Sequence, residues 1–293
     1  MLNKRIIAVS DAFADRFQGG AELSLESILE MSPCDVIRIE SFKVNKKSIE
    51  KYKNDFWIFG NFYELPRELI ISFVKKGIKY SVFEYDYKYC RYRSADIHKL
   101  ATGKDCDCNE VRYGKEVALF LHKSSLLWWM SEKQKLFYED RFNFLGDHKN
   151  SEVLSSTFSK RDTLFMRALH KLKKEKTSDY VILNSDFPIK NRIGCLAAAK
   201  KDNLSYKLVS GLPRYDMLRL LSESEGLIFL PIGKDTCPRL VIEAKLLGCK
   251  LLLNENIQHI SEDWFLKPQE EIFDYLDSRK EYFWEKVERI LNE

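Results

Sequence analysis

Two acidic residues separated by seven others, Asp235 and Glu243, form the pattern in this chain best suited to chemistry. They lie in the stretch 226–254, GLIFLPIGKDTCPRLVIEAKLLGCKLLLN, which predicts a strand, a loop, a helix and a second strand. Glu243 falls within the apolar helix, where an ionised carboxylate is rarely buried without a partner. We therefore expect a ligand to meet Glu243; the alternative is a nearby Lys or Arg.

The start of this helix is suited to binding an anion. Pro238 fits the first helical position, and Gly248 fits the position just past the helix end. Unpaired N–H groups and the positive end of the helix dipole favour a diphosphate at such a place. Arg239, in the first turn, can add a bidentate phosphate contact.

Two further positions follow predicted strands. Gly19 and Gly20 stand between the predicted strand 5–10 and a helix from 21, where they let the backbone approach a ligand closely. Lys190 follows the predicted strand 180–184. A lysine near a helix start can stabilise charge that builds up on a leaving diphosphate. Arg192 is an alternative residue for this role. If Lys190 has no such role, it is an ordinary solvated lysine. The pattern GxGxxG is missing from the first loop, which argues against a dinucleotide-binding oxidoreductase.

The spacing of Asp235 and Glu243, together with the string GGAE at 19–22, resembles the retaining GT-B glycosyltransferases of the glycogen-synthase and sucrose-synthase group. The resemblance implies that Glu243 holds the ribose hydroxyls of a sugar nucleotide. It also implies donor-binding or catalytic roles on the sugar and diphosphate for a set of other positions: Gly19, Gly20, Lys190, Asp235, Thr236 and Arg239.

The chain departs from the family pattern in several places. The first acid is Asp235 rather than Glu, while Thr236 and Pro238 occupy usual glycine positions. Asn191 follows Lys190 where the family commonly has glycine. These departures bear more on the sugar than on the nucleotide.

The stretch 79–90, KYSVFEYDYKYC, predicts a strand that ends in a polar tip. In the family this tip lies on the acceptor side and usually carries a His; here it carries Glu84 and Asp86. Carboxylates at the end of a strand can bind hydroxyls or accept a proton, so we predict acceptor-side catalytic roles for both. The alternative is ion pairing with Lys88, Arg91 or Arg93.

Seven cysteines in 293 residues do not resemble a secreted disulfide framework. Cys90, Cys106 and Cys108 are close in sequence, with His98 between them, and could hold a structural zinc ion. Their spacing matches no standard zinc finger, so reduced thiols in a polar loop are the alternative.

Composition places the chain among globular proteins. The sequence contains no run of eighteen apolar residues and no signal-peptide pattern at its start, so we expect a cytoplasmic protein. The net charge of +4 permits an anionic substrate without requiring one.

Strands alternate with helices in both halves, which predicts an α/β fold of two facing doubly wound Rossmann-like domains, as in GT-B proteins. We expect an acceptor-side domain over 1–160 and a nucleotide-sugar domain with terminal helices over 161–293. The predicted strands are 5–10, 35–40, 56–59, 79–84, 126–130, 153–156, 180–184, 206–209, 226–230 and 250–254. The predicted helices are 21–31, 66–76, 132–141, 190–201, 214–222, 238–247 and one or two within 268–292.

The expected function is transfer of a sugar from a nucleotide-diphosphate sugar to an acceptor hydroxyl, with retention of configuration and no required cofactor or metal. The acceptor stays open between a modified DNA base, as in phage enzymes, a glycan and a small metabolite. A binding module of the same architecture without transferase activity is the first alternative, and a sugar-nucleotide epimerase is another.

Overall fold

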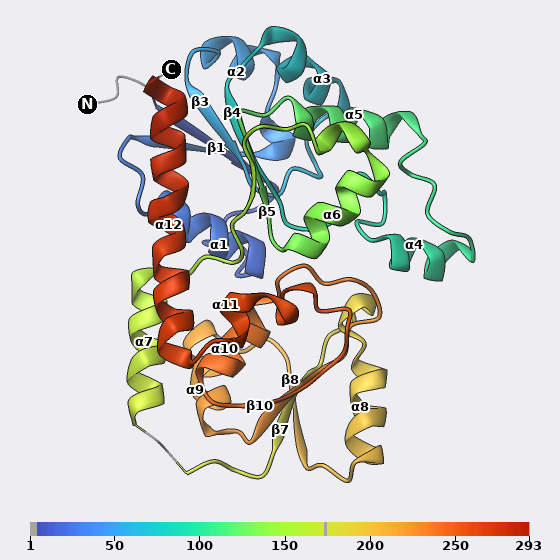
Figure 1. Cartoon of the computed structure of the whole chain (residues 1–293), viewed down its shortest axis with the longest axis vertical. Coiled ribbons are helices and arrows are strands. Elements are labelled where there is room, and N and C mark those ends of the chain that lie inside the picture. Colours follow the sequence, from blue (N-terminus) through green and yellow to red (C-terminus); the bar gives the residue numbers. More distant parts are fainter. Residues whose placement is uncertain (1–4, 173–174, 293) are drawn as a thin grey trace. The chain divides into compact units, whose positions relative to one another are not determined.

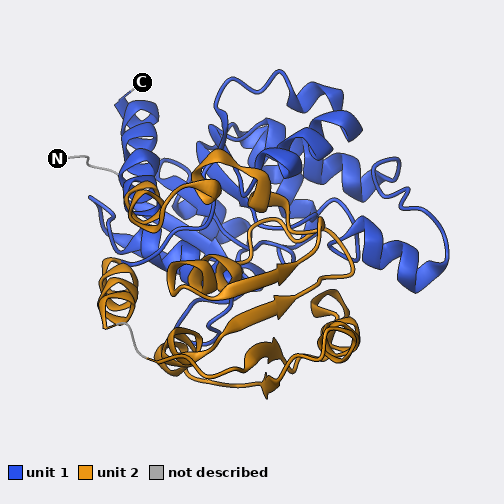
Figure 2. Ribbon diagram, turned by 60° about the horizontal axis from the view of Figure 1, so that its bottom comes forward, with its two compact units in different colours: residues 1–159, 276–293 blue, residues 160–275 orange. Residues whose placement is uncertain are grey.

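The computed structural model describes residues 5–172 and 175–292, and the chain divides into two compact units. Unit 1 comprises residues 1–159 and 276–293, and unit 2 comprises residues 160–275 (Figure 2). Each unit contains one parallel sheet, so the predicted class of two Rossmann-like α/β domains is confirmed. Residues 276–293 group with unit 1, whereas the sequence placed them in a C-terminal domain over 161–293.

Unit 1 is built on a six-stranded sheet in the order β2-β1-β3-β4-β5-β6. The strands are β1 (Ile6–Ser10), β2 (Val36–Glu40), β3 (Phe56–Phe59), β4 (Tyr80–Glu84), β5 (Leu126–Trp129) and β6 (Ser151–Val153). Four of them, β1, β3, β4 and β5, are buried along their whole length, as parallel strands covered on both faces should be.

Helices of unit 1 follow the strands: α1 (Gly20–Leu29), α2 (Lys46–Lys51), α3 (Arg67–Lys76), α4 (Ala95–Thr102), α5 (Arg112–His122) and α6 (Glu132–Arg141). Short 3-10 turns cover Ser41–Lys43 (η1) and Asn143–Leu145 (η2). Helices α3 and α5 pack together through an aromatic cluster in which the Phe59 and Phe73 ring centres lie 5.0 Å apart and those of Tyr80 and Phe120 4.6 Å apart.

Helix α12 (Gln269–Asn292) runs through the division between the units, and its second part completes the core of unit 1 (Figure 1). Phe283 lies 5.2 Å from Phe83 and 5.3 Å from Trp128, measured between ring centres. Trp284 donates from its indole nitrogen to the Ile28 carbonyl over 2.9 Å. The terminal segment is therefore part of the first core, which explains its aromatic residues.

Unit 2 has a four-stranded sheet in the order β10-β9-β7-β8. Its strands are β7 (Tyr180–Leu183), β8 (Tyr206–Val209), β9 (Gly226–Phe229) and β10 (Lys250–Leu253). Its helices are α7 (Lys160–Lys171), α8 (Arg192–Lys201), α9 (Arg214–Glu223), α10 (Arg239–Leu246) and α11 (Asp263–Leu266), with 3-10 turns η3 (Pro188–Lys190) and η4 (Gln258–Ser261). Helix α8 packs on β7 and β9, while α7, α9 and α10 contact one another.

Most predicted elements are present, but one strand is shifted and several helices were not predicted. The sixth strand covers 151–153 instead of 153–156, because Ser155 adopts a left-handed conformation (φ 69°) that ends the pairing. Helices α2, α4, α5, α7 and α11 are not among the predicted ones. No helix within 5–172 and 175–292 is long and apolar enough to cross a membrane.

Candidate functional site

The two loops that flank the switch point of the unit 2 sheet carry Lys190 and Asp235. Strand β7 pairs with β8 on one side and with β9 on the other, so the chain changes direction between β7 and β9. The loops after β7 and β9 therefore meet at the carboxyl edge of the sheet, where open α/β sheets bind ligands. Lys190 Nζ lies 3.0 Å from Asp235 Oδ2, with side chains 29% and 15% exposed. Both groups are thus within reach of solvent.

Asn191 explains why the family glycine can be absent after Lys190. Its backbone is left-handed (φ 50°), a conformation that glycine adopts freely and asparagine tolerates best among other residues. The Asn191 side chain accepts from the Gly194 amide over 3.1 Å and so caps α8, and it also donates to the Leu230 carbonyl over 2.7 Å. This second bond ties the loop after β7 to the end of β9.

The loop that holds Asp235 is fixed by main-chain bonds. The Asp235 amide donates to Asn256 over 2.9 Å, and Gln258 donates back to the Asp235 carbonyl over 3.0 Å. Helix α10 begins at Arg239, one residue later than predicted, because Pro238 is its N-cap residue and makes no side-chain cap. Gly248, with φ 73°, follows the helix end as predicted.

Glu243 lies inside a buried ionic cluster that the protein supplies itself. Arg214 donates from Nη1 to Glu243 Oε1 over 2.9 Å, and Arg239 Nε lies 3.5 Å from the same oxygen. Asp162 completes the cluster, since it accepts from Arg214 over 3.0 Å and from Arg239 over 3.2 Å. Burial opposes the charge of Arg214, but Glu243 and Asp162 outweigh it and raise the pKa of the guanidinium above its usual value.

This cluster bears on two expectations. A ligand is not needed to neutralise Glu243, because Arg214 and Arg239 already do so and the carboxylate side chain is only 5% exposed. Arg239, with a side chain 4% exposed, pairs with Asp162 and Glu243, so carboxylates of the protein already compensate its charge. Thr236, also buried, lies in the loop just before α10.

In unit 1 the switch point falls between β1 and β3, and the glycine loop lies there. Helix α1 begins at Gly20, with Gly19 as its N-cap residue. A Cβ on Gly19 would lie 2.3 Å from Glu22 Oε2 and 2.5 Å from the Phe17 ring, so these side chains would have to shift for any other residue. Glu22, 7% exposed, accepts from the Asn61 side chain over 2.9 Å, which links the start of α1 to the loop after β3.

The acceptor-side carboxylates join the same polar network. Arg93 donates to Asn61 over 3.2 Å and, over 2.5 Å, to Asp86. Lys88 Nζ lies 3.1 Å from Asp86 and 3.3 Å from Glu84. The network thus brings together residues predicted from two separate motifs, the GGAE string and the tip after β4.

The two carboxyl groups differ in their protonation. Burial raises the pKa of Glu84 to about 8, against the attraction of Lys88 and with a further increase from Asp86. The Glu84 Oε2 atom is buried without a hydrogen-bond partner among the described residues, which agrees with a poorly stabilised carboxylate. Burial would also raise the pKa of Asp86, but Lys88 and Arg93 outweigh it and lower that pKa below its usual value.

Exposure separates their possible roles. Glu84 is fully buried, and Lys88 pairs with both Glu84 and Asp86, so a role of Glu84 on an acceptor stays a prediction. The Asp86 side chain is 22% exposed and can be reached. The predicted alternative, ion pairing of these acids with Lys88 and Arg93, is also present in the structure.

Sequence reasoning missed Asp162, Arg214 and Asn61. Asp162 stands in the first turn of α7 and Arg214 at the first position of α9, far from Glu243 in sequence and without a motif around them. Asn61 is the second residue after β3, a position that could have been noted because ligand sites gather at strand ends.

No protein-family model matches the chain, and the search of curated proteins found no match either. Similar solved structures do exist. HepE from Anabaena, in complex with UDP and glucose, matches with a TM-score of 0.51 and 11% identity over 96% of this chain and 94% of that chain.

Two further structures cover almost the whole chain. One, described as trehalose-6-phosphate from E. coli bound with UDP-2-fluoro glucose, has a TM-score of 0.54 and 10% identity, over 94% of this chain and 91% of that one. A UDP-forming α,α-trehalose-phosphate synthase from Burkholderia xenovorans has a TM-score of 0.52 and 8% identity, over 97% and 99%. These likenesses show the fold, which is that of two Rossmann-like α/β domains of the GT-B class.

Proposed function

We propose that the protein is a glycosyltransferase that moves a sugar from a nucleotide-diphosphate sugar to an acceptor hydroxyl. The observation that carries the proposal is the Lys190–Asp235 pair, 3.0 Å apart at the switch point of unit 2. A partly exposed cation and a carboxylate at this edge suit a diphosphate and the hydroxyls of a sugar.

In this proposal Lys190 stabilises the diphosphate as the bond to the sugar breaks. Asp235 orients the sugar and, in the absence of donor, holds the Lys190 ammonium in place. The start of α10 is proposed to lie near the phosphates, because the positive end of the helix dipole favours negative charge there.

Glu243 is proposed to reach the ribose through one oxygen only. Both arginine contacts fall on Oε1, which leaves Oε2 for a ribose hydroxyl. The Arg214 and Arg239 contacts then fix the orientation of the carboxylate. We propose UDP as the first nucleotide to test, because all three similar structures are described with UDP, a UDP-sugar or as UDP-forming.

The acceptor is proposed to meet unit 1 near Asp86. The lowered pKa of Asp86 keeps it ionised near neutral pH, so it can accept a hydrogen bond from a hydroxyl. Gly19 and Gly20, at the start of α1, are proposed to let the backbone approach the ligand, and Glu22 of the same helix belongs to the polar network of Asp86. Retention of configuration, with the leaving phosphate helping to remove the acceptor proton, is the chemistry that the family resemblance supports.

A binding module without transferase activity is the second candidate. One observation favours it: Glu243 and Arg239 are satisfied within the protein, so the acidic pair could persist as a structural feature. Such a module would bind the nucleotide sugar without consuming it.

The test is incubation of the full chain with UDP-, GDP- and ADP-sugars. Thermal stabilisation reports binding, and release of free nucleoside diphosphate reports turnover, first to water and then to glycan, modified-DNA and small-metabolite acceptors. Stabilisation with turnover supports the transferase, and NMR of the product then gives its anomeric configuration. Stabilisation without turnover supports the binding module. Neither effect with any sugar nucleotide overturns both.

A further inference from the structure

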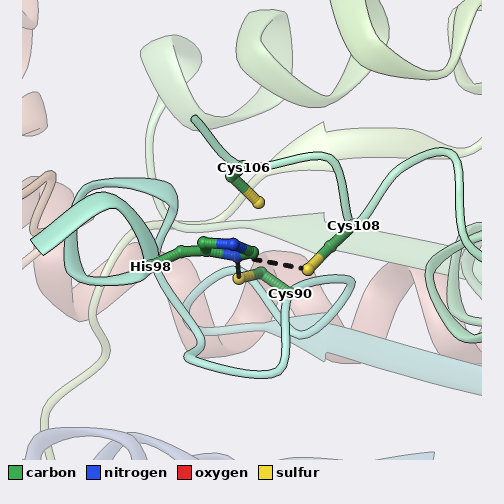
Figure 3. A group of neighbouring side chains, drawn as sticks. All are labelled: Cys90, His98, Cys106 and Cys108. Carbon is green, nitrogen blue, oxygen red and sulfur yellow. Dashed lines mark hydrogen bonds between the residues drawn. The ribbon is translucent and has the colours of Figure 1, made fainter. Parts of the chain in front are cut away.

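Four metal-binding side chains converge in unit 1, outside the network around Asp86. Cys90 comes from the loop after β4, His98 from α4, and Cys106 and Cys108 from the loop between α4 and α5 (Figure 3). Their ligand atoms all lie within 4.8 Å of one another. His98 Nδ1 is 3.6 Å from Cys90 Sγ and 3.4 Å from Cys108 Sγ.

We propose that Cys90, His98, Cys106 and Cys108 form a structural zinc site. Zinc–sulfur bonds of about 2.3 Å and zinc–nitrogen bonds of about 2.0 Å place a sulfur and a nitrogen ligand of a tetrahedron about 3.5 Å apart, and two sulfur ligands about 3.8 Å apart. The distances from His98 Nδ1, 3.6 Å to Cys90 Sγ and 3.4 Å to Cys108 Sγ, are close to the first value. The widest pair, within 4.8 Å, would close by about 1 Å on binding.

The local structure supports these positions independently of a metal. Ser94 caps α4 by accepting from the Ile97 amide over 3.3 Å, which sets the helix that presents His98. The Tyr92 amide donates to Cys90 Sγ over 3.4 Å, which helps to fix the position of this sulfur atom. A Cβ on Gly114 would lie 1.9 Å from the Cys108 carbonyl oxygen, so glycine at the start of α5 lets the Cys108 loop come close.

The surroundings show what the ion would do. His98 is the single buried residue of α4, so this helix contributes almost nothing to the apolar core. A segment with so little apolar burial needs another source of stability, and a metal ion supplies it. Four protein ligands fill a tetrahedral shell, which is typical of structural and not catalytic zinc. Cys106 is only partly buried, which leaves a path for the ion to enter.

The site would also order part of the acceptor side. Arg93, three residues after Cys90, is one of two cations that pair with Asp86, the other being Lys88. Its left-handed backbone (φ 56°) lies in the turn where the Arg93 amide donates to the Cys90 carbonyl over 2.8 Å. Fixing Cys90 therefore fixes the turn that positions Arg93. This role does not depend on the transfer reaction.

The experiment measures metal in the full chain, produced in zinc-supplemented medium and purified without chelator. We expect elemental mass spectrometry to detect about one zinc ion per chain. Replacement by Co²⁺ should give the intense visible absorption of a tetrahedral cobalt–thiolate centre. Cys108→Ser should lose most of the metal, while Cys34→Ser, which changes a partly buried cysteine outside the cluster, should keep it.

Because Cys108→Ser could also misfold, a second measurement uses the wild-type chain. Alkylation followed by peptide mass analysis should show Cys90, Cys106 and Cys108 protected until a zinc chelator is added. Three results would overturn the proposal: folded wild-type protein with neither zinc nor a cobalt–thiolate spectrum, full zinc content in a folded Cys108→Ser variant, or a disulfide among these cysteines.

Discussion

Arg214 donates to Glu243 over 2.9 Å inside unit 2, and the guanidinium side chain is only 12% exposed. The carboxylate that the motif assigns to a ligand is thus also part of the protein's own electrostatic core. Sequence motifs report which residues share a site, but the partner that neutralises a buried charge can come from anywhere in the fold. Here it comes from the first position of α9.

This relationship predicts that Glu243→Ala destabilises the protein as well as weakening donor binding. Removal of the carboxylate takes away a buried negative charge that pairs with Arg214 and Arg239, and breaking a buried pair costs about 3–5 kcal/mol. The midpoint of urea unfolding measures the loss. Glu255→Ala, at an exposed position of the same unit, should shift stability by less than about 0.5 kcal/mol. Unchanged stability of Glu243→Ala with abolished binding would assign Glu243 to the ligand alone.

Lys190→Ala should slow transfer more than it weakens binding. The ammonium acts on charge that develops on the diphosphate during bond breaking, and loss of one such donor costs about 10²–10³ in kcat. Steady-state release of nucleoside diphosphate gives kcat and KM separately. Lys201→Ala, at the exposed far end of α8, is the control and should behave as wild type. Equal turnover in both variants would remove Lys190 from the mechanism.

Glu84 predicts a pH dependence of stability. Its pKa is raised from 4.5 to about 8 in the folded protein by burial, so between these values the folded state keeps a proton that the unfolded state has released. The contribution of this group to stability therefore falls as pH rises through that window, by at most about 1.4 kcal/mol per pH unit, and is constant below it.

Glu84→Gln removes this titration, so its stability relative to wild type should improve from pH 5 to pH 8. Urea unfolding at several pH values measures the slope. Glu110→Gln, in an exposed loop, should keep the wild-type slope. Parallel curves for wild type and Glu84→Gln would contradict the raised pKa.

Gly114→Ala should destabilise unit 1 although alanine is the better helix former. The new Cβ would lie 1.9 Å from the Cys108 carbonyl oxygen, so the loop or the helix has to move, at a cost of about 1–3 kcal/mol. Gly146→Ala is the matched control, since its Cβ would meet nothing closer than the Asn143 carbonyl oxygen at 3.4 Å. Thermal unfolding compares the two variants, and equal melting temperatures would show that the Cys108 loop yields without cost.

Much of the fold is readable from the sequence because buried parallel strands are continuous apolar runs. The run FWIF predicts β3 at its observed bounds of Phe56–Phe59. Helix α4 is different: with His98 as its single buried residue it has no apolar stripe to detect. Helix α5 begins without a side-chain cap and contains Gly114, so its start carries no signal.

The candidate site was predictable only in part. Lys190 and Asp235 follow adjacent strands, and the rule that ligands gather at strand ends brings them together. The partners of Glu243 follow no such rule, since Asp162 and Arg214 meet it through the packing of α7 and α9 on α10. Likewise, His98 lies beside the cysteines because of its place on α4. The spacing of the four residues along the chain matches no standard pattern, so it does not predict this arrangement.

The path of α12 has a consequence for how the protein is made. Unit 2 is one uninterrupted segment, 160–275, so all of it is synthesised before residues 276–292 are translated. The core of unit 1 cannot be completed until then, because Phe283 packs on Phe83 and Trp284 donates to the Ile28 carbonyl. During synthesis the first sheet is therefore left with an uncovered aromatic surface until the polypeptide returns to it, and this interval is when nascent chains would most need a chaperone.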